Sequence, residues 1–170
     1  YMNEKVIVSC AVNSPYTGWL PLQQANCHKI CPEITHITWL NQWPPNSRSH
    51  IASPYGFKVY AIKAALAMGF KQVLWLDSAV FFLKHPQLIF DLIVQHSVFL
   101  LSGGTLLKEA SRNDAYDFFK VTRQESEDWP IITGGILGFN FDSASAVSLF
   151  EGWANAEQKN YFCTNGCATH

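Results

Sequence analysis

Hydrophobic and polar positions along the chain follow two periods, one typical of strands and one typical of helices. Residues 5–12 (KVIVSCAV) form a β-branched apolar run of strand length, and residues 34–40 (ITHITWL) alternate apolar with polar side chains. Between these two strands, residues 18–30 have a weakly helical pattern. Residues 56–69 (GFKVYAIKAALAMG) place apolar side chains at helical spacing and end at a glycine, which predicts a helix.

The second half of the chain continues this alternation. Residues 71–77 (KQVLWLD) are an apolar run directly after a helix, which predicts a strand that is covered on both faces. The other elements predicted are a helix over 86–96 opened by Pro86, a strand over 97–104, a partly helical stretch over 111–129, a glycine-interrupted strand over 132–142, and a helix capped by Asp142 and Ser143 that runs to about Lys159. Strands that alternate with helices predict an α/β fold with a mostly parallel sheet covered by helices.

A long connection separates the second strand from the first clear helix. Residues 41–54 (NQWPPNSRSHIASP) contain three prolines and several Ser and Asn residues, and they are too many for a tight turn. Long ordered loops in compact domains are often functional. We therefore treat this loop as a candidate part of a site.

Composition limits the classes of function. The chain has 170 residues, of which 48% are hydrophobic, so it can bury one core, and we expect a single domain over residues 1–170. A net charge of −1 offers no positive field that would gather nucleic acid or an anionic membrane. The sequence has no run of eighteen apolar residues, and its first residues lack the pattern of a secretion signal, so we expect a soluble protein with no membrane span.

Cysteine usage favours a reducing compartment. The five cysteines are an odd number and too few for a fold held by disulfides, so we expect a cytoplasmic protein with free thiols. The alternative is a zinc site built from two C-x3-C pairs, Cys27 with Cys31 and Cys163 with Cys167, although structural zinc sites more often use closer spacing.

One carboxylate, Asp77, closes the apolar run of the third predicted strand. Ligands of open α/β sheets bind beyond the carboxyl ends of the strands, which is where Asp77 is expected to lie. Asp77 could hold a divalent cation that carries phosphate groups, because Mg²⁺ or Mn²⁺ needs few protein ligands when phosphate and water complete its shell. The alternative is a local cap, in which Asp77 accepts backbone N–H bonds from the following turn with help from Ser78.

A resemblance to a known family bears on this choice. The segment SPYGFKVYAIKAALAMGFKQVLWLDSAVFFLKHP, followed by IITGGILGFNFD and a helix rich in Phe and Trp, resembles GT-A type glycosyltransferases and their bacterial and viral nucleotide-sugar transferase-like relatives. The corresponding family features are a Tyr-x-Phe-Lys helix start, a strand ending in Leu-Asp-x-Ser or Asp-x-Asp, and a later strand with glycine. The resemblance extends from about residue 50 to residue 155.

The resemblance implies a single Rossmann-like GT-A domain and a metal-dependent glycosyltransferase. Such an enzyme moves a sugar from a nucleotide-diphosphate donor to a hydroxyl of a sugar, lipid or protein acceptor, and Mn²⁺ or Mg²⁺ stabilises the departing diphosphate. Val8 and Ser9, in the first strand, are then expected beside the nucleotide. The chain is short for this family, which raises the alternative of a domain that is incomplete at its C-terminus.

Carried over by position, Asp77 matches the first carboxylate of the family pattern. The third position is Ala79, where the family has a second Asp or a Ser, so one metal ligand is missing and the Ser78 hydroxyl compensates only in part. Lys58, three residues after Tyr55 at the start of a helix, could reach the diphosphate, since a helix N-terminus also favours anions. The alternative for Lys58 is a solvated surface side chain.

Three further residues come from the same comparison. Gly134 and Gly135 would let the backbone approach the donor or acceptor closely, and the alternative is a β-bulge. His170 could serve with Asp77 as a metal ligand, because family members commonly supply such a histidine downstream, and the alternative is a frayed terminal residue. Three tryptophans could stack on sugar rings or pack in the core: Trp39, Trp43 and Trp129.

Two other functions remain open on the sequence. The missing second carboxylate is compatible with a relative that binds a nucleotide or glycan without transferring it. An Asp-dependent phosphohydrolase would use Asp77 as the nucleophile, but that chemistry usually needs an acid–base carboxylate at the position of Ala79. No pattern singles out a general base, the donor base, the sugar or the acceptor.

Overall fold

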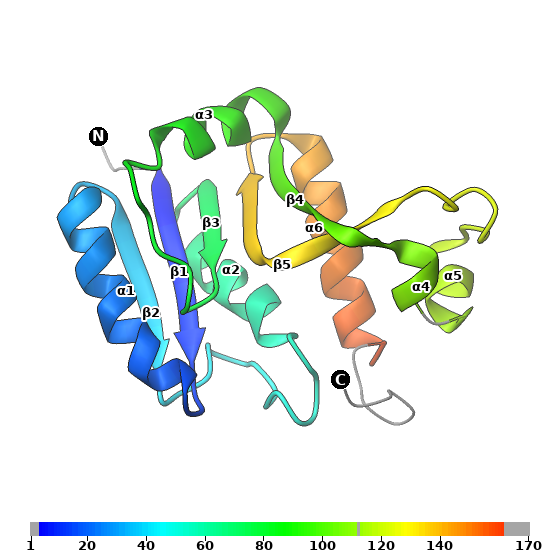
Figure 1. Cartoon of the computed structure of the whole chain (residues 1–170), viewed down its shortest axis with the longest axis horizontal. Helices are drawn as coiled ribbons and strands as arrows, with labels where there is room; N and C mark the ends of the chain where they lie inside the picture. The colour runs from blue at the N-terminus through cyan, green and yellow to red at the C-terminus, as the bar shows by residue number, and fades with distance from the viewer. Residues whose placement is uncertain (1–3, 112, 162–170) are drawn as a thin grey trace. The chain divides into compact units, whose positions relative to one another are not determined.

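The computed structural model describes residues 4–111 and 113–161 and has a mixed α/β fold (Figure 1). Its sheet has five strands in the order β2-β1-β3-β5-β4. The elements are β1 Lys5–Ala11, α1 Tyr16–Ile30, β2 Thr35–Leu40, α2 Phe57–Ala67, β3 Gln72–Leu76, α3 Gln87–His96, β4 Val98–Leu106, α4 Leu107–Ala110, α5 Asn113–Phe119, β5 Pro130–Asn140 and α6 Ala144–Gln158. Contacts divide the chain into two compact units: Tyr1–Phe99 with Gly135–His170, and Leu100–Gly134.

The centre of the sheet is parallel, as predicted. β1 pairs in parallel with β2 on one side and with β3 on the other. Val6, Ile7 and Val8 of β1 are fully buried, because helices cover both faces of a central parallel strand and leave it no solvated side. β5 departs from the prediction, since it pairs with β3 in the antiparallel direction, with Val73 opposite Phe139. The chain enters β5 near the carboxyl end of β3, so no crossover over the sheet is needed there.

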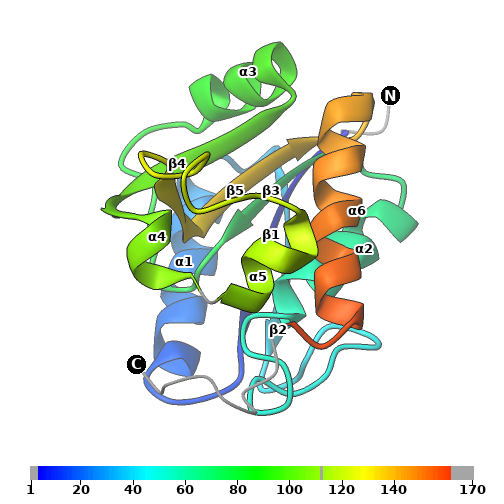
Figure 2. The same cartoon turned by 90° about the vertical axis from the view of Figure 1, so that its right-hand side faces the viewer.

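Helices cover both faces of the sheet in the first unit. Helices α1 and α3 cover one face of the sheet, and helices α2 and α6 cover the other (Figure 2). Side chains alternate along β3, so Leu74 and Leu76 point to the first face, while Val73 and Trp75 point to the second. The core on the α1 and α3 side contains Ile7, Cys27, Cys31, Ile34, Leu74, Leu76, Phe82, Phe90 and Ile93. Among the described helices, none combines the length and the hydrophobicity that crossing a membrane requires.

The chain order around β1 positions a crevice. From β1 the chain passes through α1 to β2 on one side, and then through α2 to β3 on the other side of β1 (Figure 1). The connection that leaves the carboxyl end of β1 therefore leads to β2 on one side, whereas the connection that leaves the carboxyl end of β3 leads through α3 to β4 on the other side. Such a reversal opens a crevice at the strand ends, which is the usual ligand position in open α/β sheets.

The start of α6 differs from the predicted cap. Ser143 is the N-cap residue, but its hydroxyl forms a 2.7 Å hydrogen bond with the hydroxyl of Ser97 and makes no capping bond to the helix. Asp142 pairs instead with Lys71 at 2.9 Å on the surface. Both side chains found partners on neighbouring elements, which a local sequence motif does not reveal.

The second unit, Leu100–Gly134, is held together around Arg123. Its guanidinium lies 4.7 Å from the centre of the Tyr116 ring and donates hydrogen bonds to Asn113 Oδ1 and to the carbonyl of Lys108, at 2.8 and 3.0 Å. The predicted mixed stretch over 111–129 is partly helical, as expected, since it contains α5 and then irregular turns.

Candidate functional site

A cavity of about 270 Å³ opens at the carboxyl ends of β1 and β3. Several separate segments form its wall: the end of β1, the start of α1, the loop after β2, the start of α2 and the turn after β3. The residues that line it are Cys10, Ala11, Val12, Asn13, Tyr16, Trp43, His50, Tyr55, Phe57, Lys58, Asp77, Ser78 and Ala79. The carboxylate, the lysine and the tyrosine predicted from the sequence thus lie together.

Asp77 is fixed through one of its two carboxylate oxygens. Oδ1 accepts a 2.7 Å bond from Nζ of Lys58 and a 2.8 Å bond from Nε1 of Trp75. Within residues 4–111 and 113–161, the hydrogen bonds of this carboxylate engage Oδ1 alone, and the side chain is 42% exposed. The carboxylate is not a cap for its own turn, because its donors are side chains from elsewhere. Oδ2 remains available to a ligand.

Lys58 is buried, which excludes the alternative of a solvated surface side chain. Its side chain is only 4% exposed, and its ammonium lies 5.3 Å from the ring centres of both Tyr55 and Trp75. Burial lowers the pKa of Lys58, and the charge and hydrogen bond of Asp77 act against that effect. The ion pair with Asp77 therefore stabilises the charged form of Lys58 at the cavity wall, which burial alone would disfavour.

The turn after β3 is held from α1. The buried side chain of Gln23 donates through Nε2 to the carbonyls of Asp77 and Val80, at 2.7 and 2.8 Å. The turn itself is closed by the N–H of Val80, which donates to the carbonyl of Asp77 at 2.9 Å. Ser78, inside this turn, is 3% exposed and lines the cavity. Gln23 thus sets the direction in which Asp77 points.

Aromatic rings and an imidazole form another part of the cavity wall. The ring centres of Trp43 and Phe57 are 5.3 Å apart, and those of His50 and Tyr55 are 4.7 Å apart. Burial, and then the charge of Lys58, lower the pKa of His50, so its ring is neutral at pH 7. Tyr55 has a φ of 62°, which is uncommon for a bulky residue and costs on the order of 1–3 kcal/mol. Such local strain is typical of functional sites.

Other predicted site residues lie apart from the cavity lining. Val8 and Ser9 are fully buried, and the Ser9 hydroxyl forms a 3.0 Å hydrogen bond with Nε2 of His36. The Gly135 carbonyl accepts the N–H of Asp77 at 2.9 Å, so the backbone of β5 does approach the site. Gly134 belongs to the second unit, and His170 lies outside the described residues. The binding roles assigned to these residues stay predictions.

The described cysteines are buried free thiols. Burial raises the pKa of Cys10 and of Cys27 to about 12, and that of Cys31 to about 11. Thiols with such pKa values are poor nucleophiles at neutral pH. Cys163 and Cys167 lie outside the described residues, so the four-thiolate zinc site stays an untested alternative.

The donor set at Asp77 suits a metal ion only together with a ligand. No group of three His, Cys, Asp or Glu side chains comes together within residues 4–111 and 113–161. Asp77 supplies one unengaged oxygen, Oδ2, and Ala79 supplies none. Mg²⁺ is commonly bound by one or two carboxylates when substrate phosphates and waters complete its octahedron. The described residues therefore fit a cation that arrives with phosphate oxygens.

Sequence reasoning missed two residues that position Asp77. Trp75 had a usable pattern, because residues two apart on a strand share a face, and Trp75 stands two before Asp77. Gln23 had none, since it is 54 positions away in a weakly helical segment. His50 has no sequence pattern of its own, although it belongs to the loop over residues 41–54, which was a candidate part of a site.

Comparisons with known proteins add little. No protein-family model matches the chain, and a search of curated proteins also finds no match. Among solved structures, a similar one is a glycosyltransferase involved in the glycosylation of the major capsid of PBCV-1. It is 11% identical, the match covers 91% of this chain and 67% of that one, and the TM-score is 0.43. The chemistry of the site must therefore be argued from its own residues.

Proposed function

We propose that this chain is a Rossmann-like, GT-A type glycosyltransferase that moves a sugar from a nucleotide-diphosphate donor to an acceptor hydroxyl. Its donor would bind in the cavity at the ends of β1 and β3. The observation that carries the proposal is the placement of Asp77: a rigidly held carboxylate, at the end of a buried strand, with one oxygen unengaged in an open cavity. The resemblance in the sequence supports the same chemistry.

The charges of the cavity support a donor that arrives with a cation. Among the described residues that line the cavity, Lys58 and Asp77 have formal charges, of opposite sign, and they form an ion pair at 2.7 Å. A diphosphate would therefore meet a site with almost no net charge. Mn²⁺ or Mg²⁺ would supply the missing positive charge and would stabilise the nucleoside diphosphate as it departs. Asp77 would bind this cation through Oδ2.

The other lining residues would bind and orient the donor. Trp43 and Tyr55 present aromatic surface on which a base or a sugar ring could stack, with a gain of about 1–3 kcal/mol per base. Lys58 would hold Asp77 in place through Oδ1 and share its own charge with a phosphate oxygen. The buried thiols Cys10, Cys27 and Cys31 are compatible with a reducing compartment, and we propose the cytoplasm.

Ligand-dependent stability tests this proposal. The thermal midpoint should be recorded with UDP, GDP or CDP, each with and without Mn²⁺. A ligand that binds only the folded chain at a hundred times its dissociation constant adds about 2.7 kcal/mol of stability. We expect one of the nucleotides to raise the midpoint when Mn²⁺ is present, and Asp77→Ala to abolish this shift.

A matched control exists on the surface. Asp142 forms a similar ion pair with Lys71, at 2.9 Å, but it does not line the cavity. Asp142→Ala should therefore keep the full ligand-dependent shift. The proposal would be overturned if no nucleoside diphosphate stabilised the wild-type chain, or if both variants responded alike. Stabilisation by phosphate analogues alone would point to a phosphohydrolase.

A binding-only relative is the second candidate. It is favoured by the single carboxylate at the site, because Ala79 stands where a second ligand would be expected. Release of free nucleotide from the stabilising sugar nucleotide distinguishes the two functions. A transferase releases nucleotide in the presence of an acceptor, whereas a binding module shows the stability shift and no release.

A further inference from the structure

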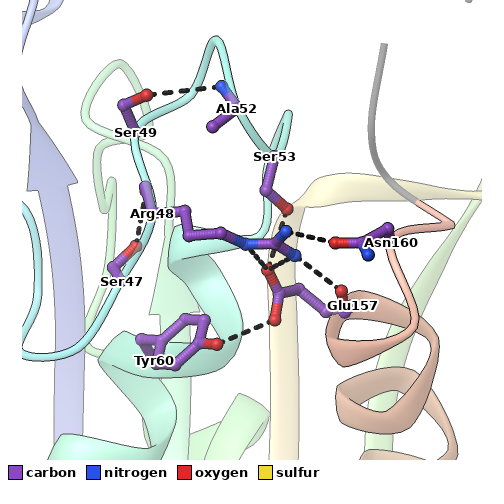
Figure 3. Close-up of polar contacts among 8 residues, drawn as sticks. All are labelled: Ser47, Arg48, Ser49, Ala52, Ser53, Tyr60, Glu157 and Asn160. Carbon is purple, nitrogen blue, oxygen red and sulfur yellow. Dashed lines mark hydrogen bonds and ion pairs between the residues drawn. The ribbon is translucent and has the colours of Figure 1, made fainter. Parts of the chain in front are cut away.

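A second group of polar side chains is centred on Glu157, near the C-terminal end of α6 (Figure 3). Glu157 is fully buried. Its Oε1 accepts bonds from Nε and Nη2 of Arg48, at 3.0 and 2.5 Å, and from the hydroxyl of Ser53 at 2.9 Å. Its Oε2 accepts a 2.8 Å bond from the hydroxyl of Tyr60 on α2. None of these four residues lines the cavity.

Glu157 is charged at neutral pH. Burial acts to raise its pKa, but hydrogen bonds from Arg48, Tyr60 and Ser53 outweigh burial and hold the pKa below its usual value. Arg48 also donates through Nη2 to the carbonyl of Glu157 at 2.7 Å, and through Nη1 to the side chain of Asn160. The guanidinium of Arg48 therefore binds both the side chain and the backbone of Glu157 at the end of α6.

The donors of this group come from two different parts of the chain. Tyr60 belongs to α2, whereas Arg48 and Ser53 belong to the long loop after β2 (Figure 3). The loop also packs tightly here: a Cβ added to Gly56 would lie 2.4 Å from Oγ of Ser53 and 3.0 Å from Cγ of Glu157. A larger residue at this position would therefore have to displace the Ser53 hydroxyl and press against Glu157.

The same loop segment supplies one wall of the cavity. His50 lies between Arg48 and Ser53 in the sequence, and Tyr55 directly precedes Gly56. Both line the cavity, and their ring centres are 4.7 Å apart. The segment has no helix or strand of its own between β2 and α2, so contacts to other elements have to fix its position.

We propose that Glu157 is a positioning residue of the cavity: through Arg48 and Ser53 it holds loop residues 48–56 so that His50 and Tyr55 form the ligand-binding wall. Helix α6 thereby takes part in ligand binding without touching the ligand. The ligand part of this inference rests on the proposed function, whereas the control of the loop by Glu157 does not.

The test compares a variant of Glu157 itself with a variant of one of its hydrogen-bond donors. Glu157→Gln replaces the acceptor that Arg48 and Ser53 share, whereas Tyr60→Phe removes one hydrogen bond to Glu157 and leaves both loop bonds in place. Hydrogen exchange should be measured for the amides of residues 48–56 and for those of β1 and β3. The pKa of His50 should be followed by NMR as a report on the loop.

For Glu157→Gln we expect exchange in residues 48–56 to rise about tenfold more than in β1 and β3, as expected when the loop opens locally. The lowered pKa of His50 should move up toward its usual value as the partly buried ring becomes more exposed. If the ordered loop is populated about one-tenth of the time, the dissociation constant of the stabilising nucleoside diphosphate rises about tenfold. Tyr60→Phe should leave all three quantities unchanged relative to the core.

Equal exchange changes in the loop and the core, or a loop response to Tyr60→Phe as large as that to Glu157→Gln, would overturn the inference. If Glu157→Gln does not fold, the double variant Arg48→Met/Glu157→Gln leaves no buried charge unpaired and serves in its place. If the wild-type chain binds no nucleoside diphosphate, the proposed function fails, while the exchange and His50 measurements still decide whether Glu157 holds the loop.

Discussion

Replacing Asp77 by asparagine removes the carboxylate charge that faces Lys58 at 2.7 Å and keeps the shape of the side chain. The two partners differ in exposure, at 4% for the Lys58 side chain and 42% for that of Asp77. Water can therefore solvate Asp77 when Lys58 is removed, but it cannot easily solvate Lys58 when Asp77 is neutralised. We expect Asp77→Asn to destabilise the fold more than Lys58→Met.

The size of this effect lies between two limits. Removing one partner of a fully buried ion pair costs about 3–5 kcal/mol, whereas an exposed pair contributes about 0–1 kcal/mol. Because Asp77 is partly exposed, water screens its ion pair with Lys58. In the variant, the asparagine oxygen can still accept a hydrogen bond from Lys58. We therefore expect Asp77→Asn to lower the free energy of unfolding by about 1–2 kcal/mol, and the double variant with Lys58→Met to recover part of that loss.

Urea unfolding followed by circular dichroism measures these changes as shifts of the midpoint at constant slope. The pH dependence supplies a second check. In Asp77→Asn the opposing charge is gone, so burial alone acts on Lys58 and lowers its pKa. The unfolded variant then binds more protons than the folded one, and its stability rises with pH toward the ordinary lysine pKa of about 10.4. The deficit of Asp77→Asn should accordingly shrink at alkaline pH.

The exposed pair of Lys71 and Asp142 is the control, and Asp142→Asn should leave the midpoint unchanged. The reasoning is refuted if Asp77→Asn proves as harmless as Asp142→Asn. It is equally refuted if the double-variant cycle shows no coupling between Lys58 and Asp77, because a buried ammonium would then need no partner.

Three further outcomes follow from single positions. Burial lowers the pKa of His36 to about 4, so the unfolded chain binds more protons and stability falls as the pH drops from about 6.5 to 4, by about 3 kcal/mol; His36→Gln should reduce this loss in acid denaturation curves. Gly138→Ala should destabilise by about 1–3 kcal/mol, since its Cβ would lie 2.5 Å from Cδ1 of Ile93, whereas Gly152→Ala, in open space within α6, should stabilise by about 0.5–1 kcal/mol; equal urea midpoints for the two variants would contradict this. Tyr55→Gly should relieve the strain of a positive φ and so raise stability, and it should nevertheless weaken nucleotide binding. A variant that is less stable and binds the nucleotide normally would show that the strain has no role.

The parts of the fold that could be predicted are those with a strong local pattern. The helix expected over 56–69 is found as Phe57–Ala67, and the strand expected over 71–77 is found as Gln72–Leu76, because apolar spacing and a stop residue are local properties. The direction of β5 was not predictable in the same way. A glycine-interrupted apolar run is compatible with either direction, and only the route of the whole chain decides between them.

The site was predictable to a smaller extent. Asp77 could be identified because a carboxylate that ends a buried strand is conspicuous in a run of apolar residues. The partners of the charged groups could not be identified from the sequence, since Lys58 is 19 positions from Asp77 and Arg48 is 109 positions from Glu157. Glu157 stands among polar residues of an amphipathic helix, where a solvated carboxylate is the ordinary expectation. Its burial depends on a loop whose position no local pattern specifies.

The indole of Trp75 gives the cavity an intrinsic optical probe. Its N–H is bonded to the carboxylate of Asp77, its ring lies beside the ammonium of Lys58, and its side chain is fully buried. The emission of an indole depends on the electric field across its ring, and here two opposite charges set that field at close range. Any molecule that draws Asp77 or Lys58 away from its partner should therefore change the fluorescence of the chain without an attached dye.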